Sequence, residues 1–282
     1  MTNPVRSIGE LIREWRQRRR LSQLELACDA EISTRHLSFL ETGRAKPSRE
    51  MVSRLADQLA IPLRDRNVIL GAAGFAPLYR ERALDDPDFR LARHSIDRIL
   101  AMHDPNPALA IDRHWTMAAA NHAVADLISG VDPLLLTAPV NVIRLSLHPA
   151  GLAPRIINLI EWRRHIIGRL RQQIEVTGDP VLADLVEEVR DYPVPAGVAG
   201  PADPRGPDMV AVPFRLATVH GDLAFLSTTT VFGSSIDITL AELAIEAFFP
   251  ADPATAAIMR RLARERGSGP PVPRPVPRVA AG

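Results

Sequence analysis

Residues that start or stop helices divide the first 75 residues of the chain into five short segments. Ser22, with Glu25 three positions later, forms a capping box that predicts a helix over Gln23–Asp29. Ser33 is the next cap, and the helix predicted over 34–42 ends before a glycine. Two helices this short, joined by so few residues, predict a helix-turn-helix. The apolar residues expected to pack these two helices together are Leu24, Ala27, Ile32, Leu37 and Leu40.

Three further helices are predicted around this pair. The first carries an apolar stripe at helical spacing between Ile8 and Trp15. Ser48 caps the fourth helix, and Pro62 begins the fifth, which two glycines end. The sequence therefore predicts an all-α head of five helices within residues 1–78.

Charge is distributed unevenly along the chain, although the formal net charge is only +1. Residues 1–80 hold 14 basic and 9 acidic side chains, residues 81–255 hold 14 and 23, and residues 256–282 hold 6 and 1. A basic head joined to an acidic body indicates that the head binds a polyanion such as nucleic acid.

The run LSQLELACDAEISTRHLSFLETGRAKPS resembles the helix-turn-helix of the lambda-repressor-like, xenobiotic-response-element (XRE) family of bacterial regulators, and the resemblance covers all five helices. Its most specific parts are Ser-Gln-x-Glu-Leu-Ala at 22–27 and Leu-Ser-x-Leu-Glu-x-Gly at 37–43. The resemblance implies that the helix over 34–42 lies in the major groove of double-stranded operator DNA. The residues that it implies in DNA contacts are Gln23, Ser33, Thr34, Arg35, His36, Ser38, Arg44 and Lys46.

These residue types also suit DNA recognition on chemical grounds. Helix N-termini offer backbone amides to phosphate oxygens, and the guanidinium of Arg35 can bond both O6 and N7 of guanine. The resemblance places Gln23 at a phosphate, and Arg44 and Lys46 at the DNA backbone. Glu41 is expected to orient Arg44 or Lys46, because DNA phosphates repel a carboxylate. An all-helical module that binds another protein remains the alternative.

From about Arg90 the sequence changes from all-helical to mixed. A connecting helix is predicted over 91–102, within a linking segment 79–104. Two short strands about a polar turn follow between 107 and 121, and then a helix over 122–128. This order of strand, turn, strand and helix resembles the opening of a PAS sensor domain.

The rest of the body, 105–255, is predicted to be α+β. We expect an extended segment over 142–147 and amphipathic helices over 156–173 and 180–190. Alternating residues over 209–218 and 222–232 predict an antiparallel hairpin about His220-Gly221.

A capping box of Thr239 and Glu242 predicts a closing helix that continues through Ala247. The expected arrangement of the body is an antiparallel sheet with helices covering one face, which can enclose a ligand between the layers.

The chain as a whole resembles a lambda-repressor-like head followed by the MmyB-like ligand-binding domain, a PAS-like sensor, from about residue 6 to 265. The runs that carry this resemblance lie at 33–40, 49–51, 72–77, 84–87, 145–152, 154–158 and 248–252. The resemblance implies a transcription regulator whose sensor holds a small apolar ligand, with a fatty acid as the best-supported class.

An acyl chain needs an apolar tunnel, and its carboxylate needs one or two charge-assisted donors. Arg144 and His148 on the extended segment, with Arg155 and Asn158 at the start of the next helix, are expected to converge on such a carboxylate. Each also has a purely structural alternative, as a capping, pairing or turn residue. The remaining candidates for the ligand site, which otherwise belong to the core, are Trp115, Asn121, Trp162, Phe214 and Phe225.

Other function classes leave little trace in the sequence. The short motifs of serine hydrolases, zinc proteases, P-loop proteins and dinucleotide-binding proteins are missing. The alternatives are therefore a ligand-free regulator that interacts with another protein and, as a minor one, an enzyme fused to a DNA-binding head. Glu161 and His165 are spaced for a shared metal, but an exposed pair without a metal is the better interpretation. No cofactor is expected beyond a bound fatty acid.

No segment is apolar enough to span a bilayer, and a single cysteine, Cys28, fits a reducing compartment, so we expect a cytoplasmic protein. One short helix reads too few base pairs for genomic specificity, which favours a homodimer on a near-palindromic operator. Residues 256–282 are expected to hold the end of the last helix and a disordered tail rich in proline and arginine, from Gly267 onward.

Overall fold

A computed structural model describes residues 6–194, 211–233 and 235–267 of the chain. It divides into two compact units. The first, the head, is Met1–Arg82 with the short segments Glu175–Gly178 and Ser234–Ala241. The second, the body, holds the sheet.

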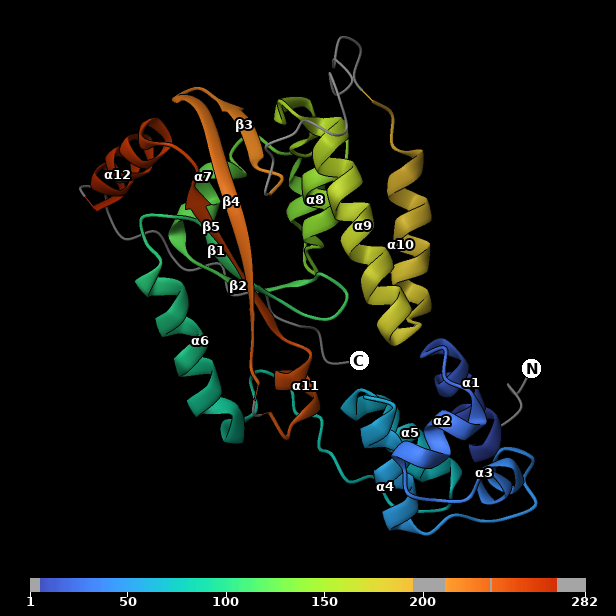
Figure 1. The fold of residues 1–282 in the computed structure, drawn as a ribbon. Helices are drawn as coiled ribbons and strands as arrows, with labels where there is room; N and C mark the ends of the chain where they lie inside the picture. Colours follow the sequence, from blue (N-terminus) through green and yellow to red (C-terminus); the bar gives the residue numbers. More distant parts are fainter. Residues whose placement is uncertain (1–5, 195–210, 234, 268–282) are drawn as a thin grey trace. The chain divides into compact units, whose positions relative to one another are not determined.

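The head contains the five predicted helices, which are confirmed: α1 (Ile8–Arg18), α2 (Gln23–Asp29), α3 (Thr34–Glu41), α4 (Arg49–Gln58) and α5 (Leu63–Ala72) (Figure 1). Serine side chains cap the first four, and the predicted capping box of Ser22 and Glu25 is present. Each cap accepts a hydrogen bond from a backbone amide that the helix itself leaves unpaired. Local capping therefore sets these helix boundaries.

The packing between α2 and α3 differs from the prediction at one position. Leu24 is 68% exposed, whereas Leu26 is fully buried and takes its place in the core. Leu26, Ala27 and Ala30 form one face of α2 and its cap. A residue two positions before Leu26 points about 200° away around the helix, and therefore toward solvent.

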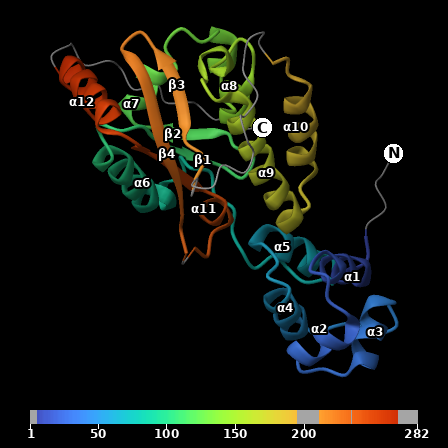
Figure 2. The ribbon, with the colours of Figure 1, turned by 45° about the horizontal axis from the view of Figure 1, so that its top comes forward.

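The body is built on a five-stranded antiparallel sheet with the order β2-β1-β5-β4-β3 (Figures 1 and 2). The strands are β1 (Ala108–Ile111), β2 (Met117–Ala120), β3 (Phe214–Thr218), β4 (Gly221–Val231) and β5 (Ala244–Pro250). The predicted hairpin is confirmed as β3 and β4, with Thr218 opposite Gly221. Met209 and Val210, the beginning of the predicted first strand, lie outside the described residues.

Helices cover both faces of this sheet, whereas the sequence predicted one. The helices of the body are α6 (Arg90–Met102), α7 (His122–Leu127), α8 (Val142–Leu147), α9 (Leu159–Thr177), α10 (Pro180–Asp191) and α12 (Pro253–Gly267). The main core joins one sheet face to α7, α8, α9, α10 and α12. A second cluster packs α6, through Ile96 and Leu100, against Ala108, Ala110 and Ile245 on the other face. The connecting helix is therefore part of the body's core.

The extended segment predicted over 142–147 is wrong, because these residues form α8. The branched side chains of this run favour a strand locally. However, Asn141 Oδ1 accepts hydrogen bonds from the backbone amides of Ile143 and Arg144, each at 3.1 Å, and so begins a helix. Burial of Leu145 and Leu147 against the core then stabilises the helical form.

The closing helix predicted from the capping box at Thr239 is also wrong beyond its first turn. The helix α11 (Ile238–Ala241) is short, and the residues that follow form β5, which pairs with both β1 and β4. Asp237 Oδ1 accepts the hydrogen bond from the Thr239 amide at 3.0 Å, so Thr239 is not the cap. Pairing on both edges thus overrides the local helix signal.

Two predictions concern the ends of the chain and the membrane. The last helix, α12, ends at Gly267, and the rest of the predicted tail lies outside the described residues. None of the described helices is both long and apolar enough to cross a bilayer.

Candidate DNA-binding surface and ligand cavity

The residues predicted to contact DNA lie on or beside α3. Ser33 Oγ accepts a hydrogen bond from the His36 amide at 3.1 Å, which confirms Ser33 as the cap of α3. Arg35 is exposed, and its guanidinium lies 5.3 Å from the ring centre of Phe39. Thr34, His36 and Ser38 are partly exposed on the same helix. Arg44 and Lys46, in the loop that follows, are exposed.

Arg16 and Glu41 form a buried ion pair within the head. Arg16 Nε donates to Glu41 Oε1 at 2.6 Å, and Arg16 Nη2 donates to Glu41 Oε2 at 2.9 Å. The Arg16 and Glu41 side chains are only 10% and 2% exposed. Hydrogen bonding to Glu41 raises the pKa of Arg16, so the guanidinium stays charged. The expectation that Glu41 orients Arg44 or Lys46 is therefore wrong, because its carboxylate points into the head.

Gln23 belongs to the same cluster. Its Nε2 donates to Glu41 Oε2 at 2.8 Å, so the first residue of α2 is tied to the last residue of α3. Arg16 also donates to the Leu21 carbonyl through Nη1 at 2.8 Å. These bonds connect α1, α2 and α3 through side chains. Sequence reasoning missed Arg16, although it lies four residues after Ile12 on the apolar face of α1.

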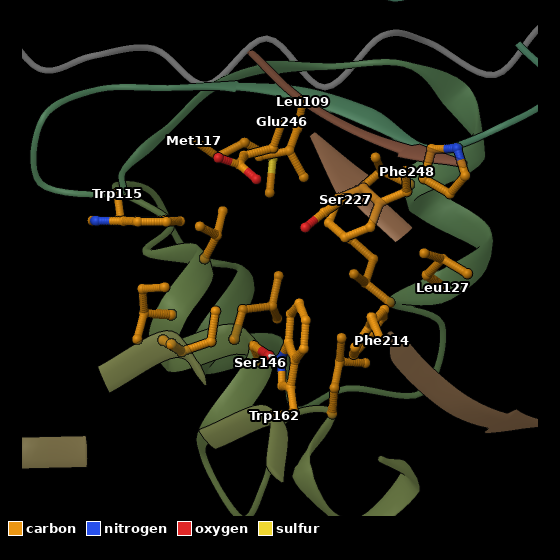
Figure 3. Close-up of a pocket in the computed structure, with 18 of the residues that line it drawn as sticks. Leu109, Trp115, Met117, Leu127, Ser146, Trp162, Phe214, Ser227, Glu246 and Phe248 are labelled. Carbon is orange, nitrogen blue, oxygen red and sulfur yellow. Dashed lines mark hydrogen bonds between the residues drawn. The ribbon is translucent and has the colours of Figure 1, made fainter. Parts of the chain in front are cut away.

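The body encloses a cavity of about 80 Å³ between its sheet and α7, α8 and α9 (Figure 3). The lining is almost wholly apolar and includes two tryptophans and two phenylalanines. The apolar lining residues are Pro107, Leu109, Trp115, Met117, Val124, Leu127, Ile128, Val142, Ile143, Leu145, Leu152, Trp162, Ile166, Phe214 and Phe248.

Four polar residues complete the lining: Ser146, Ser227, Arg169 and Glu246. Ser146 Oγ accepts the indole N–H of Trp162 at 3.1 Å, which fixes the ring at the cavity wall. Arg169 and Glu246 form an ion pair at 2.7 Å. Glu246 and Ser227 stand on the sheet side of the cavity, across from Ser146 and Trp162 (Figure 3).

Of the predicted ligand residues, Trp115, Trp162 and Phe214 line this cavity. Phe225 is fully buried in the core and contacts the edge of Phe248 rather than the cavity. Asn121 is buried and holds β1, because its Oδ1 accepts the Ala108 amide at 3.1 Å. Both are outside the lining given by the described residues.

The four residues expected to bind a carboxylate are not brought together at the cavity. Arg144, on α8, pairs with Glu188 at 2.7 Å, and this bond lowers the pKa of Glu188. His148 Nδ1 accepts the Ala150 amide at 3.1 Å, and Arg155 donates to the Leu127 carbonyl at 2.6 Å. Asn158 donates to the Pro213 carbonyl at 2.9 Å. Each of the four side chains therefore has another partner within the protein.

The pair spaced for a metal is explained by other contacts. Glu161 Oε2 accepts a hydrogen bond from Asn158 at 2.9 Å. The His165 ring packs 5.4 Å from that of Trp162, and burial, assisted by Arg169, lowers the pKa of His165. Among the residues that the structure describes, no cluster of three metal-ligating side chains exists.

Sequence reasoning missed Arg169 and Glu246, the two charged residues of the cavity. The available signal was a glutamate in the middle of an otherwise apolar run, Ala-Ile-Glu-Ala-Phe-Phe at 244–249. In a strand, such a glutamate shares a face with Ala244 and Phe248, which pack toward the main core.

Comparison with known proteins assigns both units. Residues 92–262 match the family model of the MmyB-like transcription regulator ligand binding domain, and residues 7–68 match a helix-turn-helix domain. HTH-type transcriptional regulators of Mycobacterium tuberculosis and Mycobacterium bovis are 31% identical over 137 residues, which is 49% of this chain and 46% of theirs.

The chain thus spans less than half the length of these curated relatives. Among solved structures, the clp gene regulator ClgR from Corynebacterium glutamicum matches with 24% identity and a TM-score of 0.22, over 37% of this chain and 97% of that one.

Proposed function

The chain belongs to the MmyB-like transcription regulators, with a helix-turn-helix DNA-binding head, and we propose that an apolar ligand in its cavity modulates sequence-specific operator binding through α3. The observation that carries the proposal is the pairing, in one chain, of an exposed helix-turn-helix surface with an apolar cavity in the body.

The division of roles on the DNA follows from exposure and chemistry. Arg35 is exposed on α3, where its guanidinium can bond a guanine, whereas Lys46 in the following loop is proposed to neutralise a phosphate. Arg35→Ala should therefore reduce the free energy of binding to the operator by about 1–3 kcal/mol and relax specificity at one base pair. Lys46→Ala should weaken binding to all DNA sequences by about the same factor and lower the salt dependence of binding.

Fluorescence anisotropy on operator and random duplexes, across a salt series, measures both effects. Arg13→Ala, a change at an exposed arginine on α1, is the matched control for loss of one positive charge. Equal effects of Arg35→Ala and Lys46→Ala on operator and random DNA would overturn these roles.

The ligand of the cavity is proposed to be an acyl-chain molecule, with a fatty acid as the class that the family resemblance suggests. The sheet order 2-1-5-4-3 and the helices packed on it support the PAS-like sensor expected from the sequence. The free volume of about 80 Å³ lies below the roughly 300–1,000 Å³ of typical ligand sites. A long chain therefore needs flexible lining residues such as Met117 to move aside.

Native mass spectrometry of the purified chain, followed by solvent extraction and lipid analysis, tests ligand binding directly. We expect a bound molecule with an alkyl chain. An empty chain that also shows no thermal shift with alkyl ligands would refute the ligand proposal and leave DNA binding standing.

We further propose that the regulator acts as a homodimer on a near-palindromic operator, without catalytic activity and without a cofactor other than the ligand. The ligand would act by binding more tightly to one of two dimer arrangements, only one of which fits the operator. Analytical ultracentrifugation with and without operator DNA measures the stoichiometry, and one chain per operator would contradict the dimer.

A further inference from the structure

At the polar end of the cavity, Arg169 and Glu246 form an ion pair. Glu246 Oε1 accepts from Arg169 Nη2 at 2.7 Å, and Oε2 accepts from Nη1 at 3.2 Å. Thr229 Oγ1 donates to Glu246 Oε1 at 2.7 Å and accepts from Arg169 Nη2 at 2.8 Å. The Glu246 side chain is 5% exposed and that of Arg169 is 23% exposed. The carboxylate thus lies deep, with its charge already balanced.

Both partners are held rigidly in place. In the sheet, Glu246 stands directly between Leu109 on β1 and Thr229 on β4. The Arg169 guanidinium lies 4.7 Å from the ring centre of Trp115, another lining residue. A two-point bond to the carboxylate and an aromatic face together preorganise the guanidinium. The pair is therefore a fixed part of the wall.

This arrangement leaves no unbalanced cation for an acyl carboxylate. Arg169 is the only cationic side chain among the described residues that line the cavity. An ionised carboxylate placed here would lie beside Glu246, and two adjacent carboxylates strongly disfavour double ionisation. An ammonium group would be attracted by Glu246 but repelled by Arg169. A neutral group avoids both penalties.

Hydrogen-bonding groups at this end suit a neutral partner. Ionised Glu246 only accepts hydrogen bonds, so a ligand must donate to it. Ser227, on the neighbouring strand and opposite Phe248 in the register, points its hydroxyl toward the cavity (Figure 3). That hydroxyl can donate to a ligand oxygen. A hydroxyl or a primary amide meets both requirements.

We propose that the cavity selects a ligand with a neutral, hydrogen-bond-donating head group, a hydroxyl or a primary amide, which donates to Glu246 and accepts from Ser227. The alkyl chain lies among the apolar lining residues. This refinement rests on the proposed ligand binding, and a fatty acid fits the same position only in its protonated form.

Calorimetric titration of the delipidated full chain with octanol, octanamide, octanoate and octylammonium tests the head group at constant chain length. At about pH 8 a free alkanoic acid is ionised. We expect octanol and octanamide to bind at least about tenfold more tightly than either charged ligand, a ratio that corresponds to about 1.4 kcal/mol. Octanoate or octylammonium binding as tightly as octanol would overturn the inference while leaving ligand binding intact. No binding by any of the four would overturn both proposals.

Glu246→Gln provides the second test, because it keeps the shape of the side chain and leaves the Arg169 charge unbalanced. We expect the preference for octanol over octanoate to fall by about tenfold or to reverse. Glu188→Gln is the matched control, since it breaks the Arg144 pair outside the cavity lining and should keep the wild-type ranking. An unchanged ranking in Glu246→Gln would contradict the role of the pair. If that variant does not fold, the ranking in the wild-type chain decides.

Discussion

Removing the Glu41 carboxylate should destabilise the head strongly, because it leaves the Arg16 charge buried without a partner. Glu41→Ala breaks three hydrogen bonds to the carboxylate, two from Arg16 and one from Gln23. The Arg16 side chain is 10% exposed and retains only the Leu21 carbonyl as an acceptor. Breaking one partner out of a buried ion pair costs about 3–5 kcal/mol. We expect a loss of that size in the free energy of unfolding of the head.

Hydrogen exchange followed by mass spectrometry measures the loss in free energy of unfolding separately in peptides from α1, α2 and α3 of the full chain. A cost of about 3–5 kcal/mol speeds exchange by roughly two to four orders of magnitude, up to the rate of the unfolded chain. Peptides from the body's sheet are the internal control.

A double variant separates the buried charge from simple loss of packing. Arg16→Met with Glu41→Leu replaces the pair by apolar side chains of similar length, which is often neutral or stabilising. We expect protection near the wild-type level. Exchange in Glu41→Ala within about threefold of wild type, a change of under about 1 kcal/mol, would refute the reasoning. A double variant as unstable as the single one would show that packing is the cause.

Three further predictions follow from burial and backbone geometry. The lowered pKa of His165 means that the folded body binds fewer protons than the unfolded chain, so the stability of the body should fall as pH drops through about 6.5. His165→Gln should make the melting temperature less dependent on pH, and an unchanged pH dependence would contradict this reasoning. Leu26→Ala should cost about 2–5 kcal/mol in urea unfolding and Leu24→Ala less than about 0.5, because only Leu26 is buried; similar costs would refute the packing of α2. Gly151→Ala should cost at least about 1–3 kcal/mol, because the new Cβ would lie 2.3 Å from the Leu145 carbonyl oxygen, and a wild-type melting temperature would disprove that close approach.

The sequence predicted the head well because its helix boundaries are local. Ser22 and Ser33 act within three residues of themselves, so the bounds of α2 and the start of α3 could be predicted without knowledge of the tertiary fold. The exposure of Leu24 on α2 could not be predicted in the same way. Which residues of a short helix are buried depends on the neighbouring helices.

The wrong prediction at β5 comes from long-range pairing. The run that forms β5 follows a local helix signal, and its strand state depends on β1, which lies far earlier in the chain, and on β4. Because of this error, Glu246 and its partner Arg169, 77 residues apart in the sequence, were not predicted to line the cavity. The aromatic residues Trp115, Trp162 and Phe214 were predicted because large apolar side chains indicate a cavity or core in any register.

The central claim, that ligand occupancy in the body modulates operator binding by the head, is tested most directly by measuring operator affinity with and without ligand. An operator is first selected from genomic fragments with the full chain. Its dissociation constant is then compared, by fluorescence anisotropy, between delipidated chain and chain saturated with the extracted ligand. Couplings of this kind are typically about 5- to 150-fold, and we expect a shift in that range for the operator and none for random DNA. An operator affinity that stays the same while the ligand demonstrably fills the cavity would contradict the account.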